Sequence, residues 1–425
     1  MPAQLLSSTP EKVILQLELP VSGSMLEQEE RIQEVLNEAG RLFTGEVLSR
    51  FDTDGAPILI GATKWTSKGQ EPKHYQTPYG EIKVARHVYQ TAKGGATFCP
   101  LDRDARIVVS STPRFAKQVT SKYAEFGAPR VVSDLFENHG RKVTQSFVQN
   151  VCDAVGSVAQ AKEEDWHFAT PKLDEAVDSI AVGMDGTCML MCHGGYREAM
   201  VGNLSLYDAQ GQRLHTIYVG ATPEYGKATF KRRMEREIEQ VKQQYPKAHV
   251  IGVADGAAEN WTFLTQHTEA QVLDYYHASE YVVQVAKAVF RKKDERDPWL
   301  ADRLHRLKHK QGAASRLIKE MEGFQQLPRL SKSAREDLAA SLTYFRNHKH
   351  QMNYPRYRRQ GWPIGSGVTE AACKTLVKQR LCASGMRWKE KGAAVVLSLR
   401  SLIRSTGRWQ QFWGKIDQYG FPVAA

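Results

Sequence analysis

The spacing of apolar residues changes several times along the chain, and each change marks a boundary between predicted segments. Within residues 1–75, an apolar run predicts a strand over residues 13–19, and an amphipathic pattern predicts a helix over about residues 26–51. Residues 76–110 then alternate apolar and polar side chains ahead of Gly94 and Gly95, which is typical of a hairpin. The sequence therefore opens with an α+β region followed by a β-rich patch.

The pattern becomes helical over residues 111–177. A short apolar helix ends near Gly140 here, and Thr144 is suited to open a second helix. Two helices joined in this way are typical of helix-turn-helix modules, so we expect this region to bind DNA, with Arg141 and Lys142 in the turn as contacts. An ordinary pair of antiparallel helices has the same pattern and remains the alternative.

Residues 178–276 carry the clearest succession of strands and helices. Three consecutive strands joined by Gly-containing turns are followed by a helix from about Lys227, a strand that ends at Asp255, a short helix and a final strand. This order is that of a ribonuclease H-like mixed sheet, in which the first and fourth strands are neighbours. Asp185 lies in the first strand, so the predicted fold brings it beside Asp255.

A helical stretch over residues 277–362 is expected to interrupt this core as an insertion. Residues 363–425 then begin with a Gly-Pro turn that leads into a further helix. Ser366 is a suitable N-cap for that helix, which places Glu370 about one turn inside it. The predicted fold class is therefore α/β: a ribonuclease H-like core, an all-helical insertion and an N-terminal α+β DNA-binding region.

Charge is distributed unevenly along the chain. Residues 281–425 contain 29 basic and 11 acidic residues, a net charge of +18, whereas residues 1–280 contain 29 basic and 36 acidic residues, a net charge of −7. Clustered lysines and arginines bind phosphates and release counterions, so the C-terminal third is expected to face a polyanion. A basic surface that is merely solvated is the alternative.

Cysteine positions and hydropathy indicate the cellular compartment and argue against a membrane span and a cysteine metal site. Six scattered cysteines and an N-terminus without an apolar core indicate a reducing, cytoplasmic location. No apolar run approaches the ~18 residues of a membrane span. Cys188, Cys192 and His193 lack the spacing of metal ligands, and alternation along a strand would separate neighbours, so we reject a metal cluster there.

The predicted topology gathers three carboxylates at one place. Asp185 and Asp255 would lie side by side, with Glu370 across from them. Carboxylates about 4 Å apart repel by a few kcal/mol per pair at an effective dielectric near 20, so a cation is expected between them. Oxygen ligands favour Mg²⁺ or Mn²⁺. Two ions ~3.5–4 Å apart would support phosphodiester cleavage, with Asp185 binding both, Asp255 one and Glu370 the other.

Four short motifs carry a resemblance to a known family. They are "VGMDGT" at 182–187, "VADGAAENW" at 253–261, "LDYYHASEY" at 273–281 and "GSGVTEAACK" at 365–374. Over about residues 181–412 the chain resembles the DDE transposases of bacterial insertion sequences, most closely the ISKra group. The resemblance implies an enzyme that cuts and joins DNA at element ends with Mg²⁺ and without a covalent protein intermediate. It implies the catalytic triad Asp185, Asp255 and Glu370.

Mutator-like relatives of that family also have a Cys or Asp followed three positions later by His, which corresponds to Asp274 and His277 here. His277 would orient the scissile phosphate or polarise water, since histidine titrates nearest neutrality, with Asp274 in support. Alternatively, Asp274 only caps the helix that carries His277.

Aromatic and basic residues alternate near the end of the insertion. Arg356, Arg358 and Arg359, with Tyr354 and Tyr357, are predicted to bind phosphates and stack on bases. A plain basic helix end is the alternative.

The helix of Glu370 supplies further candidate DNA contacts. Lys374, Lys378 and Arg380 are expected to grip the strand being cut, unless they form a solvated face. Trp388 would stack on an unpaired base near the cut, or else pack in the core.

The leading hypothesis is a DNA transposase that binds element ends, cleaves them with two metal ions and joins the 3′-hydroxyl ends to target DNA at the bacterial nucleoid. Two ends must be held together, so at least a homodimer on DNA is expected. One alternative is a nuclease or resolvase on the same core. The other is a domesticated, non-catalytic DNA-binding protein, although all three carboxylates are present.

Overall fold

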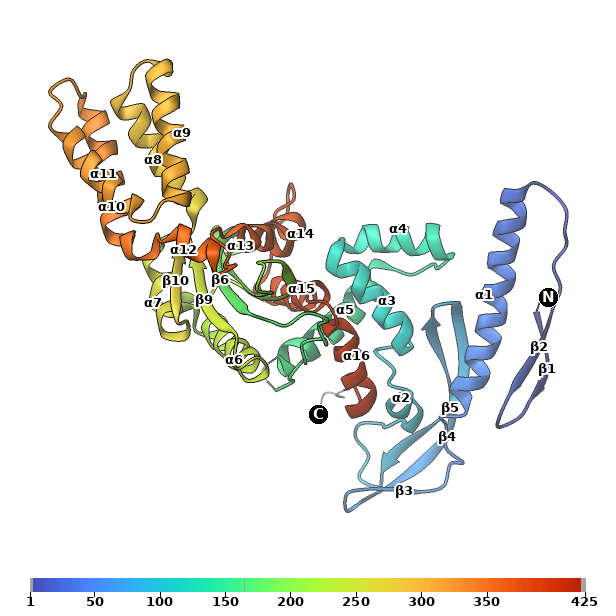
Figure 1. Ribbon diagram of the computed structural model, residues 1–425. Helices are drawn as coiled ribbons and strands as arrows, with labels where there is room; N and C mark the ends of the chain where they lie inside the picture. Colours follow the sequence, from blue (N-terminus) through green and yellow to red (C-terminus); the bar gives the residue numbers. More distant parts are fainter. Residues whose placement is uncertain (1–2, 164, 422–425) are drawn as a thin grey trace. The chain divides into compact units, whose positions relative to one another are not determined.

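The computed structural model describes residues 3–163 and 165–421 and shows a mixed α/β protein (Figure 1). The chain forms two compact units. The first comprises Met1–Phe168, Ala394–Ile403 and Arg408–Ala425, and the second comprises Ala169–Ala393 and Arg404–Gly407. Most of the C-terminal tail therefore groups with the first unit.

The first unit combines two antiparallel sheets with helices. Its strands are β1 (Ala3–Ser8), β2 (Val13–Leu17), β3 (Ile58–Ile60), β4 (Thr63–Thr77) and β5 (Gly80–Thr91). Its helices are α1 (Met25–Ser49), α2 (Pro100–Asp104), α3 (Pro113–Glu125), α4 (Ala128–His139), α5 (Gln145–Lys162), most of α15 (Glu390–Arg404) and α16 (Arg408–Tyr419). β1 pairs with β2, and β4 lies between β3 and β5.

Helix α1 begins with a complete capping box. The Ser24 hydroxyl accepts the N–H of Glu27 at 3.3 Å, and the Glu27 carboxylate accepts the N–H of Ser24 at 2.8 Å. Farther along, Gly40 leaves room for the ring of Tyr79 at the turn between β4 and β5. The strand predicted over residues 13–19 and the helix predicted over residues 26–51 are confirmed as β2 and α1.

The β-rich patch forms a different hairpin from the one predicted. β5 pairs with β4 before it, through a turn that precedes Gly80. After the turn at Gly94 and Gly95, the chain pairs with β5 at a single residue. Phe98 exchanges two 2.8 Å backbone hydrogen bonds with Tyr89. Most of β4 is exposed and polar, so it lacks the apolar alternation by which a strand is recognised in a sequence.

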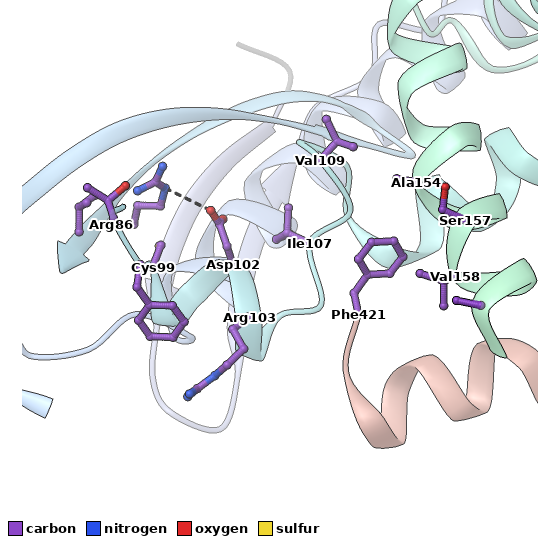
Figure 2. Close-up of a pocket in the computed structure, with 14 residues that line it drawn as sticks. Arg86, Cys99, Asp102, Arg103, Ile107, Val109, Ala154, Ser157, Val158 and Phe421 are labelled. Carbon is purple, nitrogen blue, oxygen red and sulfur yellow. Dashed lines mark ion pairs between the residues drawn. The ribbon is translucent and has the colours of Figure 1, made fainter. Parts of the chain in front are cut away.

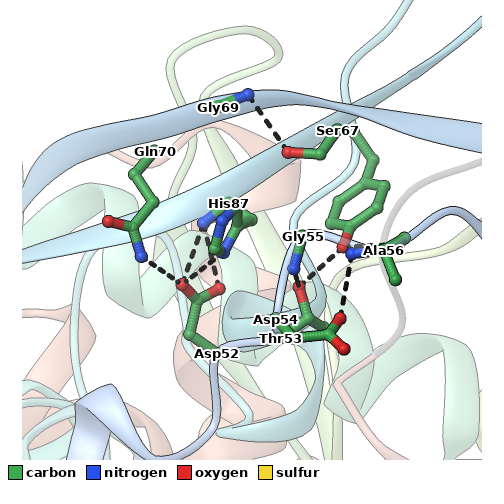
Figure 3. A network of polar contacts seen from close by, with 10 residues as sticks. Asp52, Thr53, Asp54, Gly55, Ala56, Ser67, Gly69, Gln70 and His87 are labelled. Carbon is green, nitrogen blue, oxygen red and sulfur yellow. Dashed lines mark hydrogen bonds and ion pairs between the residues drawn. The ribbon is translucent and has the colours of Figure 1, made fainter.

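Asp52, just after α1, ties this helix to the hairpin (Figure 3). Its carboxylate accepts the N–H of His87 at 2.9 Å, lies 2.9 Å from the ring Nδ1 of His87, and accepts the side-chain amide of Gln70 at 3.3 Å. The side chains of Asp52 and His87 are only 8% and 16% exposed. A carboxylate that is withdrawn from water but has several donors forms a stable junction, so α1 is held firmly on the hairpin.

Helices α4 and α5 form the pair that the sequence predicted. α4 ends at Gly140, whose φ of 61° is the left-handed conformation that commonly terminates helices. α5 begins after Thr144, whose hydroxyl accepts the N–H of Phe147 at 3.1 Å.

The second unit is built on one mixed sheet. Its strands are β6 (Ser179–Leu190), β7 (Tyr196–Tyr207), β8 (Arg213–Ala221), β9 (His249–Ala254) and β10 (Ala270–Leu273). Its helices are η1 (Tyr225–Lys227), α6 (Ala228–Gln244), α7 (Ala258–His267), α8 (Tyr275–Val289), α9 (Lys293–His309), α10 (Ala313–Gln325), α11 (Lys332–His348), η2 (Lys349–Gln351), α12 (Tyr354–Arg359), α13 (Gly367–Ala372), the π-helix η3 (Cys373–Lys378) and α14 (Gln379–Leu381).

The strand order of this sheet is β10-β9-β6-β7-β8. β7 runs antiparallel to β6 and β8, whereas β9 runs parallel to β6 and β10. The predicted neighbourhood of the first and fourth strands is confirmed. In the β6–β9 ladder Ser179 pairs with His249 and Val182 pairs with Gly252. The same register, extended, brings Asp185 level with Asp255.

Helices cover both faces of the sheet. A side chain at Gly202 of β7 would meet Met234 of α6. A side chain at Gly183 of β6 would meet Thr369 of α13, on the opposite face. Because side chains alternate along a strand, Asp185 shares the face of Gly183 and points toward α13.

The predicted helical insertion is confirmed as α8 to α12. Its buried side chains, among them Leu307, Met321, Leu338 and Phe345, belong to the same hydrophobic cluster as Val182 in the central strand. The insertion and the sheet therefore share one core.

Candidate active site

Asp255 stands where β9 ends and the chain turns into α7. Its Oδ1 accepts the N–H of Ala257 at 3.2 Å. Gly256 follows with a φ of 116°, a conformation that glycine adopts with least strain. The side chain of Asn260 in α7 donates to the carbonyl of Met184 at 3.2 Å and so ties this turn to β6. Asp255 is thus both a turn residue and a carboxylate at the carboxyl end of a strand.

Asp185 is partly buried in β6. Its Oδ1 accepts the N–H of Gly186 at 2.7 Å. Burial raises the pKa of the Asp185 carboxyl, and the negative charges of Asp255 and Glu198 raise it further. The charge of Asp255 is among the causes of this shift, which agrees with the register that brings the two aspartates level.

Glu370 reaches the same face of the sheet from α13. Ser366, the N-cap residue of this helix, has its hydroxyl 3.2 Å from Oε1 of Glu370. Thr369, the neighbour of Glu370, donates to Oδ1 of the buried Asn203 on β7 at 2.7 Å. Gly183 has no side chain that would obstruct this approach. α13 is therefore docked directly on β6 and β7, with Glu370 at its exposed side.

Cys373 lies close to Asp185 and on the same side of its helix as Glu370. It lies one turn after Glu370, and its Sγ is 3.9 Å from Oδ2 of Asp185. Burial raises the pKa of the Cys373 thiol to about 12, with contributions from the charges of Asp185 and Glu370. Both carboxylates thus lie within electrostatic reach of one thiol. The sequence analysis missed Cys373, although its position three residues after Glu370 places both on one side of a helix.

Asp274 is a structural junction. It is 1% exposed, its Oδ1 accepts the N–H of His277 at 2.9 Å as the cap of α8, and its Oδ2 accepts the N–H of Ser366 at 2.5 Å. The hydroxyl of Ser366 donates to the same oxygen. Asp274 therefore caps α8, as the alternative interpretation held, and also fixes the residue that begins the helix of Glu370.

His277 is half-exposed on the first turn of α8. Its Nδ1 lies 3.6 Å from Oε2 of Glu280. The ring lies near those of Tyr281 and Tyr344, with centroids 6.0 Å and 6.4 Å away. Tyr281 and Tyr344 stack on each other at 3.8 Å.

Tyr344 links the insertion to the Asp255 turn. Its hydroxyl donates to the backbone carbonyl of Asp255 at 2.8 Å, and its ring lies against Gly256. Burial raises the pKa of Tyr344, so the hydroxyl keeps its proton. No local pattern indicates this contact of Tyr344, because some ninety positions separate it from Asp255 along the chain.

A lysine-centred group of charges borders the site on the other face of the sheet. Lys227 has its Nζ 2.7 Å from Glu198 of β7 and 3.0 Å from Glu259 of α7. Its φ of 56° is unusual for a residue other than glycine. The ion pairs join the starts of α6 and α7 to β7 beside Asp185.

The carboxylates do not form a closed cage for a single ion. Among the residues that the structure describes, no group of three or more His, Cys, Asp or Glu side chains is close enough to hold one. Asp185 and Asp255 do offer adjacent oxygen donors, and no basic side chain is among the causes that shift the Asp185 pKa. Mg²⁺ commonly takes only one or two carboxylates and keeps its waters, so this donor set suits it.

Most of the basic residues predicted to contact DNA are exposed. These are Lys142, Arg356, Arg358, Arg359, Lys374 and Lys378. Lys142 lies over the ring of Phe136, and Arg358 has Nη1 2.7 Å from Nδ1 of His309. Their charges remain accessible to an anionic partner.

Arg141 and Arg380 are buried, at 5% and 3% exposure. Arg141 donates to the carbonyl of Thr77 at 3.0 Å and to the side chain of Gln76 at 2.7 Å. Arg380 lies over the ring of Trp388. Both guanidinium groups are used inside the protein, so neither is placed to reach a phosphate of DNA.

The aromatic residues predicted to stack on bases also pack inside. Tyr354 and Tyr357 are buried, and Tyr357 stacks on Trp362. Trp388 is partly buried, and its Nε1–H donates to the carbonyl of Leu381 at 2.9 Å. The core-packing alternative for Trp388 is thus supported, and the base-stacking prediction for the two tyrosines is wrong.

A separate cavity of about 650 Å³ lies in the first unit (Figure 2). Its wall is largely apolar, with Ile107, Val158 and Phe421 among the lining residues. Asp102, on the same wall, is paired with Arg86 at 3.8 Å and with Lys73 at 3.0 Å. The Asp102 carboxylate is thus already paired with two cations, so the carboxylates of the second unit remain the candidate for chemistry.

No protein-family model matches the chain, and a search of curated proteins finds no significant match. None of the described helices combines the length and hydropathy that a membrane span requires.

Proposed function

We propose that the chain is a DNA transposase of the DDE type, whose catalytic residues are Asp185, Asp255 and Glu370. The observation that carries this proposal is spatial. The β6–β9 register, extended past Ala254, brings Asp185 level with Asp255, and α13, the helix that carries Glu370, packs on the face of the sheet toward which Asp185 points.

The sheet supports a ribonuclease H-like core. Three antiparallel strands are followed by two strands added in parallel beside the first, in the order β10-β9-β6-β7-β8. Fold alone does not decide function, so the placement of the three carboxylates within that order is the stronger argument.

Two Mg²⁺ or Mn²⁺ ions would be held by Asp185, Asp255 and Glu370. When bound, such ions activate a water or a 3′-hydroxyl and stabilise the leaving oxygen of a phosphodiester. The protein's own contribution is positioning. Asp274 fixes the start of the helix that bears Glu370, and Tyr344 fixes the backbone of Asp255.

DNA would bind along the exposed basic residues of the second unit. Arg356, Arg358 and Arg359 end α12, and Lys374 and Lys378 follow Glu370 on its own helix. Phosphate contacts from such side chains set the register of a duplex without reading its sequence. His277, half-exposed beside the Tyr281–Tyr344 stack, would orient the phosphate to be cut.

The test uses linear DNA that carries the terminal repeats flanking the gene, incubated with protein and Mg²⁺. Asp185→Ala, Asp255→Ala and Glu370→Ala should each lower cleavage at least ~10³-fold while leaving DNA affinity nearly unchanged. Glu239→Ala, which removes an exposed carboxylate of α6, is the matched control and should cleave normally.

The products separate the proposal from its alternatives. Joined products in which a 3′ end is attached to new DNA support a transposase. Cuts without joining indicate a nuclease or resolvase, and binding without cuts indicates a non-catalytic DNA-binding protein. Normal cleavage by any of the three variants would remove that residue from the site.

A further inference from the structure

Exposed apolar side chains are concentrated at the N-terminal end of the described chain. Of the 23 large apolar residues that are exposed among the described residues, 13 lie before residue 52. They are Leu5, Leu6, Ile14, Leu17, Leu19, Val21, Met25, Leu26, Ile32, Leu36, Phe43, Val47 and Phe51. Single exposed apolar residues are ordinary, but a cluster of this size marks a surface that another molecule covers.

On α1 five of these residues lie in a stripe along one side of the helix. Met25, Ile32, Leu36, Phe43 and Val47 recur at intervals of seven and four, which places them on one side of the helix. The intervals are those of a helix that packs lengthwise against another helix.

The stripe belongs to an ordered helix. α1 starts at the capping box of Ser24 and Glu27, and beyond its end Asp52 is bonded to His87 (Figure 3). Arg50, the C-cap residue, donates to the carbonyls of Thr9 and Pro10 at 2.7 Å and 3.0 Å. The apolar side chains therefore project from a helix that is already ordered before any partner binds.

The β1–β2 hairpin beside α1 is incomplete as a structural unit. It is a two-stranded sheet in which Leu5 and Leu17 are exposed on the same face, while Ile14 is exposed on the opposite face. A two-stranded hairpin is at best marginally stable in water unless its apolar face is covered. Its apolar side chains call for the same kind of partner as the stripe on α1.

The net charge of residues 1–51 limits the kind of partner that this surface can bind. Residues 1–51 carry four basic and eight acidic residues, so nucleic acid and anionic membranes are repelled. Within α1, residues 25–38 carry five glutamates and one arginine, whereas residues 39–50 carry two arginines and one glutamate. Two copies of α1 in antiparallel orientation would bring each acidic half against the slightly basic half of the other. A parallel pair would align the two acidic halves.

We propose that this surface, the α1 stripe with the apolar face of β1–β2, is a homodimer interface in which two α1 helices pack antiparallel. A two-fold axis near Ala39 would place Leu36 opposite the partner's Phe43 and Ile32 opposite the partner's Val47. The interface forms without DNA, so it does not rest on the proposed catalytic function.

The test is the molar mass of the DNA-free full-length protein, measured by light scattering during size-exclusion chromatography at micromolar concentrations. The wild type should have twice the chain mass of 47.9 kDa. The double variant Leu36→Glu with Phe43→Glu should be a monomer, with self-association weakened at least ~100-fold. Leu59→Glu, at a still more exposed leucine of β3, should remain a dimer.

Circular dichroism checks that the variants fold. If the glutamate variant does not, Leu36→Ala with Phe43→Ala keeps helix propensity and should still weaken dimerisation at least ~10-fold. A monomeric wild type would overturn the proposal, as would a folded double variant that stays dimeric.

Introduced cysteines test the orientation, in a background where the exposed Cys188, Cys192 and Cys382 are replaced by serine. The double variant Leu36→Cys with Phe43→Cys should form disulfides between copies upon oxidation, because the antiparallel arrangement places these two positions opposite each other. Met25→Cys, on the same stripe, should not form one, because antiparallel helices carry the two copies of this position apart. Efficient cross-linking at Met25→Cys would show a parallel pair and overturn the antiparallel arrangement.

Discussion

Asp185 combines burial with negative neighbours. Burial raises the pKa of its carboxyl, and the charges of Asp255 and Glu198 add to this effect, while the N–H of Gly186 opposes it. Below about pH 3.9, the pKa of an aspartate in an unfolded chain, the carboxyl is protonated in both the folded and the unfolded protein. In that range the raised pKa of the folded state makes its full contribution to the free energy of unfolding. That contribution is lost as the pH rises through the folded pKa, because the folded protein must then carry an unfavourable charge.

Asp185→Asn should therefore stabilise the metal-free protein at neutral pH. The difference in Tm between variant and wild type should be near zero below about pH 4 and grow as the pH rises, by about 2–4 °C for each kcal/mol relieved. Calorimetry in EDTA across this pH range measures it. Mg²⁺ should raise the Tm of the wild type and have less effect on the variant. A variant that is less stable than wild type at pH 7 in EDTA would contradict this account.

Tyr344 of the helical insertion contacts the Asp255 turn through its ring and donates its hydroxyl to the carbonyl of Asp255. Tyr344→Phe removes the hydrogen bond to the carbonyl of Asp255, at a cost of about 0.5–1.5 kcal/mol of stability. Because small displacements of catalytic groups are costly, the cleavage rate should fall about 10-fold or more. Single-turnover cleavage and denaturant unfolding measure the two effects.

DNA affinity separates positioning from binding in this variant. It should be unchanged in Tyr344→Phe, since the residue acts on the backbone of Asp255. Tyr225→Phe, at a tyrosine that is 98% exposed, makes the same chemical change without an internal partner and should cleave normally. An unaltered cleavage rate in Tyr344→Phe would show that the insertion does not position the site.

Elements with a strong period were predictable from sequence. The strand that contains Asp185, the strand that precedes Asp255 and the helix opened by Ser366 were each marked by apolar runs or by turn and cap residues. Their order along the chain was enough to predict which strands are adjacent. The relative placement of the two aspartates followed from local patterns and one topological rule.

Contacts between distant elements were not predictable. Nothing local to Tyr344 or Asp274 indicates that one bonds to Asp255 and the other to Ser366, because these pairings depend on how helices pack. The predicted DNA contacts of Arg141 and Arg380 were wrong for a related reason. A basic residue near a turn has the same local pattern whether its guanidinium meets solvent or, as in Arg141, backbone carbonyls.

The net charge differs between the N-terminal and C-terminal parts of the chain, and each charge suits a different kind of partner. Residues 1–51 are acidic and apolar and suit association between copies, whereas residues 281–425 carry a net charge of +18. The polyanion-facing role of the latter can be tested without knowing the DNA sequence recognised, since phosphate contacts make affinity depend on salt in proportion to their number.

Arg358→Ala with Arg359→Ala should weaken DNA binding and reduce the slope of log affinity against log salt by up to about two, because each phosphate contact contributes about 0.9. Arg358 has other N–H groups free to reach a phosphate, since only one nitrogen lies beside His309. Fluorescence anisotropy across a salt series measures the slope. Lys247→Ala is the matched control, because Lys247 is exposed just before β9, at the end of that strand opposite Asp255, and should leave the slope unchanged. An unchanged slope in the double variant would place the DNA elsewhere on the second unit, whereas an equal loss in both proteins would mean that only net charge matters.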